Sequence, residues 1–172
     1  RSILLSKRKV DIFGNNARIA HGALFSMTPI PTIKQIFAVN LFAGMEITQS
    51  VIRRMVHQKS GSIINMASIS GLDLNAGNSA YGVSKAALIA WTKTVAAELG
   101  GTGVRINAVA PGLTDTRMAT YMESKARDEM IRRSAENRLT TPQEIANVVL
   151  FLASDLSSHV NGQIIRVDGG QK

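Results

Sequence analysis

The feature of this sequence that most restricts its fold is an alternation of short apolar runs with longer helical stretches. Each run has the length and composition of a buried strand. The four runs are residues 10–13, 62–66, 104–109 and 163–167. Strands joined by helical crossovers lie parallel in one sheet. We therefore predict an α/β fold, with a parallel sheet covered by helices on both faces, formed by one domain over residues 1–172.

The helical stretches are marked by apolar residues at steps of three and four. Residues 32–57 carry this pattern, and residues 80–99 carry it until Gly100 and Gly101 stop the helix. A charged helical stretch is expected at about 121–135. The clearest helix start is Thr141–Glu144, where a threonine N-cap, a proline and a glutamate form a capping box.

Composition excludes several classes of protein. Hydrophobic residues make up 45% of the chain and charged residues 19%, and no apolar run approaches the ~18 residues of a membrane-spanning helix. The absence of cysteine excludes disulfides and thiolate metal sites. His21, His57 and His159 lack the spacing of metal ligands. We expect a cytoplasmic protein with no metal site and no membrane partner.

The net charge of +8 is concentrated in the first third of the chain. Residues 1–60 hold nine Lys/Arg and two acids, a difference of +7. This asymmetry indicates either an acidic segment elsewhere that would balance it or a surface for polyanions or an acidic carrier, with Arg53, Arg54 and Lys59 as its centre. No aromatic residues are interleaved with the basic ones, so we expect no nucleic-acid partner.

Tyr81 and Lys85 are the candidate catalytic pair. Their spacing of four places both on one face of the helix at 80–99. A free phenol has a pKa of about 10 and is a poor base at neutral pH, whereas a nearby cation stabilises phenolate and allows proton exchange with a substrate. A Tyr-x-x-x-Lys pair alone is a weak signal, and an exposed helix face is the alternative.

Further polar residues follow the predicted strands, where ligands of parallel sheets bind. Each has a simpler alternative, such as a turn cap for Ser68, a buried kink for Asn40 and a turn for Asn15 and Asn16. The groups are Asn15-Asn16-Ala17 after the first strand, Ser68 after the second, Pro111–Thr116 after the third, Val167–Gly170 after the last, and Asn40 within the first helix.

Together these motifs closely resemble the short-chain dehydrogenase/reductase family, whose patterns are Asn-Asn-Ala-Gly, a helix asparagine, a strand-end serine, Tyr-x-x-x-Lys and Pro-Gly followed by threonine. The resemblance covers essentially all 172 residues. It is strongest to beta-ketoacyl carrier-protein reductases and to similar alcohol and sugar dehydrogenases. It implies a Rossmann-like doubly wound sheet, of which this chain would be the C-terminal portion, and hydride transfer between NAD or NADP and a carbonyl or alcohol.

The resemblance also implies a role for each site residue. Tyr81 would be the general acid and base, Lys85 would favour the phenolate and bind the nicotinamide ribose, and Ser68 would hold the substrate oxygen. Asn40 would anchor a water that relays protons to Lys85. The cofactor-binding residues would be Asn16, Ala17, Tyr81, Lys85, Pro111, Gly112, Thr114 and Thr116.

Other implications concern substrate and assembly. Residues 72–79 and 118–138, with Tyr121 in a possible lid, would line the pocket for a small carbonyl or alcohol substrate. Family members form homodimers or homotetramers through the helices that correspond to residues 32–57 and 80–99. The substrate and the choice between NAD and NADP are not readable from the sequence.

Two departures from the family pattern leave an alternative open. The glycine-rich pyrophosphate loop is absent, so we expect the family's first three strands upstream of Arg1 and an exposed sheet edge at residues 10–14. The chain would then be a truncated gene product, a proteolytic fragment or part of a longer protein. Arg18 replaces the last glycine of Asn-Asn-Ala-Gly. Both departures favour an inactive family member that acts as an oligomerisation or interaction module.

Overall fold

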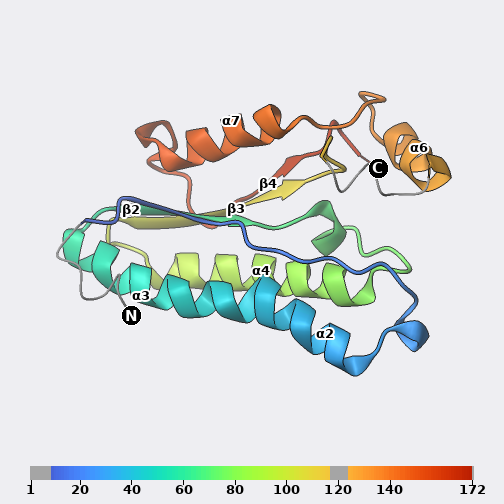
Figure 1. The fold of residues 1–172 in the computed structure, drawn as a ribbon. Coiled ribbons are helices and arrows are strands. Elements are labelled where there is room, and N and C mark those ends of the chain that lie inside the picture. The colour runs from blue at the N-terminus through green and yellow to red at the C-terminus, as the bar shows by residue number, and fades with distance from the viewer. Residues whose placement is uncertain (1–8, 117–123, 172) are drawn as a thin grey trace.

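A computed structural model describes residues 9–116 and 124–171. They form three layers, with a parallel sheet between helices α2, α3 and α4 on one face and α7 on the other (Figure 1). The strands are β1 (Ile12–Asn15), β2 (Gly61–Met66), β3 (Val104–Pro111) and β4 (Ile164–Val167). They pair in the order β1-β2-β3-β4, all in parallel. The predicted α/β fold with helices on both faces is confirmed.

The helices agree with the predicted pattern except in one place. The helix expected at 32–57 is two α-helices joined by a turn of π-helix at Ala38–Phe42, which the apolar spacing did not reveal. The α-helices are α2 (Ile30–Phe37), α3 (Ala43–Gln58), α4 (Ser79–Glu98), α6 (Ser124–Arg133) and α7 (Pro142–Ala153). Short 3-10 turns lie at Phe25–Met27, Ile69–Gly71 and Asp155–Ser157.

The central strands are apolar on both sides because both faces of the sheet are covered. Ile63 on β2 and Ile106 on β3 are fully buried against α3 and α4. Ile64 and Val109 point to the other face, where they pack with Leu152 of α7. This alternation gives the two central strands two buried faces and explains why both read as largely apolar runs.

Helix α7 begins where the capping box predicted. The Thr141 hydroxyl accepts a hydrogen bond from the Glu144 backbone N–H at 3.3 Å, and a Glu144 carboxylate oxygen accepts one from the Thr141 N–H at 2.8 Å. Arg138 also binds this carboxylate. Hydrogen bonds from Arg138 and then Thr141 lower the pKa of Glu144 to about 2.

The sheet brings the predicted site residues to one end. Register pairs Asn15 with Asn65, and Pro111 with Val167, so the carboxyl ends of the strands lie together. The green turn after β2, α6 and the C-terminal end lie at this end of the molecule (Figure 1). At the lateral edge, β1 leaves Ile12 55% exposed. Within the described ranges, no helix is long and apolar enough to cross a membrane.

Candidate active site

Tyr81 and Lys85 lie together in the first turns of α4, on the face that meets the sheet. Both side chains are buried, with Tyr81 8% and Lys85 1% exposed. The Lys85 Nζ atom lies 5.9 Å from the centroid of the Tyr81 ring. The alternative of a solvated helix face is therefore wrong, and the ammonium group lies over the face of the Tyr81 ring.

The Lys85 ammonium group is held at the end of β2. Its Nζ donates a hydrogen bond to the Met66 carbonyl oxygen at 2.7 Å. Burial, and secondarily the positive charge of Arg18, lower the pKa of Lys85 from 10.5 to about 8. The Arg18 side chain is exposed, and its charge is the smaller of the two causes that lower the pKa of Lys85.

Ser68 follows Met66 by two residues, at the start of the 3-10 turn Ile69–Gly71. Its side chain is nearly buried, and its Oγ accepts a hydrogen bond from the Ser70 N–H at 3.1 Å. The turn-cap role considered for Ser68 is therefore real. It does not compete with a role in binding substrate, since a hydroxyl can also donate.

Two glycines allow this turn to pack directly on α4. A methyl group placed on Gly71 would lie 2.7 Å from the Lys85 backbone carbonyl carbon, and one on Gly82 would lie 2.7 Å from the Ser70 carbonyl oxygen. Neither neighbour is the end of a flexible side chain. Because neither position has a Cβ, the turn that begins at Ser68 can pack in direct backbone contact with α4, the helix that carries Tyr81.

Replacing Gly71 by alanine is expected to destabilise the fold by about 1–3 kcal/mol, because an added methyl must push the turn off the helix. Urea unfolding of the two proteins measures the difference. Gly22→Ala is the matched control, since the nearest atom to its added methyl is 4.0 Å away. Equal unfolding midpoints for Gly71→Ala and the unmodified protein would show that the contact is not constraining.

Asn40 connects three segments at the centre of the π-helical turn. Its Oδ1 accepts from the Ile19 N–H at 2.8 Å, and its Nδ2 donates to the Ile19 carbonyl at 2.9 Å and to Ser84 Oγ at 3.1 Å. Ser84 Oγ in turn donates to the Tyr81 carbonyl at 2.7 Å. Asn40 therefore joins the loop after β1 to the turn of α4 that carries Tyr81. The water relay expected of Asn40 stays a prediction.

At the end of β1 the three-residue motif separates into buried and exposed parts. Asn15 is buried, and its Nδ2 donates to Asn65 Oδ1 at 3.3 Å, while Asn65 Nδ2 donates to Thr92 Oγ1 at 2.9 Å. Gly44 leaves room for the Asn15 amide, which a Cβ there would overlap. Asn16 and Ala17 are exposed, so they lie at the rim where a cofactor could reach them.

The segment after β3 lies beside β4. The Gly112 N–H donates to the Val167 carbonyl at 2.9 Å, and Thr114 Oγ1 donates to the Gly112 carbonyl at 3.0 Å. Thr116 Oγ1 donates weakly to the Thr114 carbonyl at 3.4 Å. The predicted nicotinamide-side residues Pro111, Gly112, Thr114 and Thr116 are thus at the same end of the sheet as Ser68. Met118 and Tyr121 lie outside the described residues.

A cavity of about 640 Å³ lies elsewhere, at the amino ends of β1, β2 and β3. Asp11, Gly61 and His159 are among its lining residues. It contains none of the predicted site residues. We place the active site at the opposite end of the strands, because ligands of open parallel sheets bind there and the buried Tyr81–Lys85 pair lies there.

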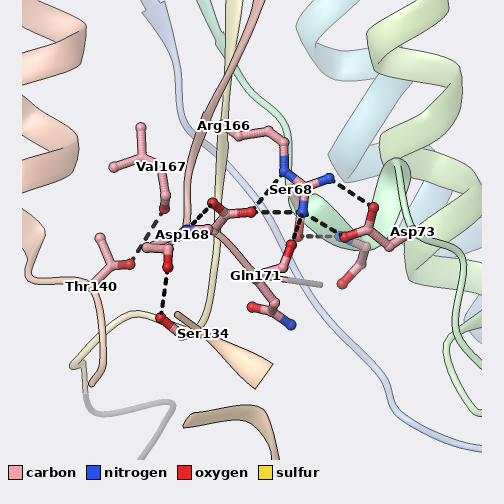
Figure 2. A network of polar contacts seen from close by, with 11 residues as sticks. Ser68, Asp73, Ser134, Thr140, Arg166, Val167, Asp168 and Gln171 are labelled. Carbon is pink, nitrogen blue, oxygen red and sulfur yellow. Dashed lines mark hydrogen bonds and ion pairs between the residues drawn. The ribbon is translucent and has the colours of Figure 1, made fainter. Parts of the chain in front are cut away.

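Several residues of the site were not found by sequence reasoning. Ser84 and Asn65 are ordinary polar residues inside apolar elements, and only their partners give them a role. Arg166 and Asp73 are 93 residues apart and form an ion pair (Figure 2), with Asp73 bonded through its N–H to Ile69 of the turn that follows Ser68. No local pattern marks these four residues, because each acts through a contact distant in sequence.

A four-stranded parallel sheet with helices on both faces is a Rossmann-like α/β fold. The family model described as enoyl-(acyl carrier protein) reductase matches residues 3–172. The chain belongs to the short-chain dehydrogenase/reductase family.

Individual relatives agree with this family. The chain is 42% identical to a 3-oxoacyl-[acyl-carrier-protein] reductase of Thermotoga maritima, over 94% of the chain and 66% of that protein. It is 34% identical to an acetoacetyl-CoA reductase of Acinetobacter, over 97% of the chain and 67% of that protein. The chain therefore spans about two thirds of the length of the curated relatives it matches.

Solved structures share the fold closely. One, assigned as an NAD(P)-dependent gluconate 5-dehydrogenase of Beutenbergia cavernae with bound NADP, has a TM-score of 0.93 at 33% identity, covering 98% of this chain and 68% of that one. A 4-hydroxyisoleucine dehydrogenase mutant in complex with NADH and succinate has a TM-score of 0.92 at 32% identity, covering 99% and 72%.

Proposed function

We propose that this chain acts as an NAD(P)-dependent oxidoreductase that transfers a hydride between the cofactor and a carbonyl or alcohol substrate. The observation that supports this proposal most is the buried Lys85 ammonium beside the Tyr81 phenol, with Ser68 on the adjoining turn. Burying a lysine this deeply destabilises the folded state. A role in proton transfer at the neighbouring phenol would explain why a lysine occupies this position.

The residues at the strand ends fit a nicotinamide cofactor. Lys85 and Tyr81 offer an ammonium group and a hydroxyl suited to ribose hydroxyls, while Thr114, Thr116 and the exposed Asn16 offer further polar groups. When bound, the cofactor supplies or accepts the hydride. Relatives are known with NADP and with NADH, so both nucleotides are candidates for this protein.

The protein's own groups would handle the proton. In reduction, the Ser68 hydroxyl would donate a hydrogen bond to the substrate oxygen and stabilise the charge that develops there. The Tyr81 hydroxyl would give its proton to that oxygen, and in oxidation the same atom would take the proton back. Lys85 would stabilise the phenolate formed during turnover, since it lies over the Tyr81 ring.

Titration with NADPH, and separately with NADH, tests the proposal through nicotinamide fluorescence. We expect a saturable change with an affinity of roughly micromolar order, as is common for enzyme ligands. Absence of any change at millimolar protein would contradict the proposal. The interaction-module alternative would then take its place, supported by exposed apolar side chains at Phe42, Ile47 and Val83.

A homo-oligomer is part of the proposal. Phe42 and Ile47 leave apolar surface exposed at the turn before α3 and on α3, and Val83 does so on α4. These are the elements through which a homodimer or homotetramer was predicted. The cytoplasmic location expected from the sequence stays a prediction.

A further inference from the structure

One guanidinium group, that of Arg166 on β4, binds three other groups, which belong to Asp73, Asp168 and Gln171 (Figure 2). Its Nη1 and Nη2 donate to the two carboxylate oxygens of Asp73, each at 2.8 Å. Its Nε donates to Asp168 Oδ2 at 2.7 Å, and Nη2 also donates to the Gln171 carbonyl at 3.0 Å. Only the planar five-donor fork of arginine can make this set of contacts.

Asp73 connects Arg166 to the turn that begins at Ser68. The Asp73 N–H donates to the Ile69 carbonyl at 2.8 Å, and the Gly71 N–H donates to the Ser68 carbonyl at 3.0 Å. Ser68 caps the same turn through its side chain. Since these bonds make residues 68–73 one compact unit, the position of the Asp73 carboxylate constrains the position of Ser68.

Asp168 connects Arg166 to the turn after β3. A methyl group on Gly112 would lie 2.9 Å from Asp168 Cα, so the two backbones are in direct contact. The Asp168 side chain is only 6% exposed, and its Oδ1 accepts from the Gly170 N–H at 3.2 Å. Arg166 therefore reaches the Gly112 turn through a buried and well-held carboxylate.

We propose that Arg166 is a positioning residue that holds the Ser68 turn at a fixed distance from the Gly112 turn. The inference rests on the proposed function, in which Ser68 holds the substrate oxygen and Gly112 lies on the nicotinamide side. The Arg166 and Asp73 side chains are 35% and 33% exposed, so this pair contributes little to folding stability, whereas the buried Asp168 carboxylate also depends on Arg166 for stability. The part of the network that reaches the Ser68 turn therefore acts mainly on geometry, to which hydride transfer is sensitive.

Arg166→Gln is expected to reduce kcat by roughly 10- to 100-fold, since a misplacement of about 1 Å can have this effect. Asp73→Asn, which keeps the shape but loses the paired carboxylate, should lower kcat by a smaller factor. The pH profile of kcat should be unchanged, because Tyr81 and Lys85 are not altered. This readout separates positioning from a direct effect on proton transfer.

Glu144→Gln is the matched control. It removes the carboxylate of another two-nitrogen arginine pair, with Arg138, while glutamine can still complete the capping box of α7. Hydrogen exchange at the amides of Gly71, Leu72 and Asp73 gives a readout independent of turnover. Exchange there should be faster in Arg166→Gln and unchanged in Glu144→Gln.

The outcomes distinguish this inference from the proposed function. If the unmodified protein reduces a carbonyl compound and Arg166→Gln does so within twofold of it, Arg166 is not a positioning residue and the proposed function stands. If the unmodified protein shows no turnover with NADPH or NADH, the proposed function fails. In that case, amide exchange at residues 71–73 that is the same in Arg166→Gln and in the unmodified protein would also overturn the role of Arg166. Faster exchange in Arg166→Gln would support the proposal that Arg166 positions the Ser68 turn.

Discussion

Replacing Tyr81 by phenylalanine is expected to lower the turnover number for carbonyl reduction by about 10²- to 10⁴-fold, the range typical of a lost general acid. The substitution removes one oxygen atom from a side chain that is already buried, so the ring and its packing remain. What is lost is the only group of the proposed mechanism that can give a proton to the substrate oxygen. Consumption of NADPH or NADH at saturating substrate measures the effect.

The control for Tyr81→Phe is the affinity for cofactor. The variant should bind NADPH or NADH within a few-fold of the unmodified protein, since Lys85 keeps its hydrogen bond to the Met66 carbonyl. Its urea unfolding midpoint should also be close to that of the unmodified protein. Turnover above about a tenth of the original value would contradict a proton-transfer role for this phenol, because general-acid catalysis contributes at least ~10²-fold.

The parts of the molecule that could be predicted from sequence are those governed by local rules. The capping box at Thr141–Glu144 fixed the start of α7 because all its partners lie within four residues. The strands at 62–66 and 104–109 were found because burial on both faces favours strands in which most residues are apolar. The spacing of Tyr81 and Lys85 predicted a shared helix face for the same local reason.

The parts that could not be predicted depend on contacts between distant residues. The π-helical turn at Ala38–Phe42 centres on Asn40, whose partners Ile19 and Ser84 lie 21 and 44 residues away. The Arg166–Asp73 pair spans 93 residues. Apolar periodicity contains no information on these hydrogen bonds, so the sequence marked Asn40 as important without indicating what it binds.

For Arg18, the sequence revealed the departure from the family pattern but not its effect on the site. Its position at the end of Asn15-Asn16-Ala17-Arg18 was clear from the sequence, but the direction of its effect was not. The structure gives the direction, since the charge of Arg18 adds to burial in lowering the pKa of Lys85. A second cation near the site makes it more costly to keep Lys85 charged, and this cost can be measured through stability.

Replacing Lys85 by methionine is expected to abolish most reductase activity while making stability less dependent on pH. Methionine fills a similar elongated volume without a charge. The pKa of Lys85 in the folded protein is about 8, against an ordinary lysine pKa of 10.5. Between these two pH values the Lys85 side chain is protonated in the unfolded chain and deprotonated in the folded protein. The free energy of unfolding of the unmodified protein therefore rises with pH across this window. Below about pH 8 the lysine is charged in both states, and the folded protein is destabilised by the full cost of burying the cation.

The difference in unfolding free energy, Lys85→Met minus the unmodified protein, should therefore fall by roughly 2–3 kcal/mol between pH 7 and pH 10, at about 1.4 kcal/mol per pKa unit. Urea unfolding of both proteins at each pH measures it, and taking the difference cancels groups that titrate equally in both. Lys93→Met is the matched control, because Lys93 is an exposed lysine on the same helix and its difference should stay flat. A flat difference for Lys85→Met would mean that its ammonium group is as well solvated as that of Lys93, and the electrostatic basis of the proposed site would be lost.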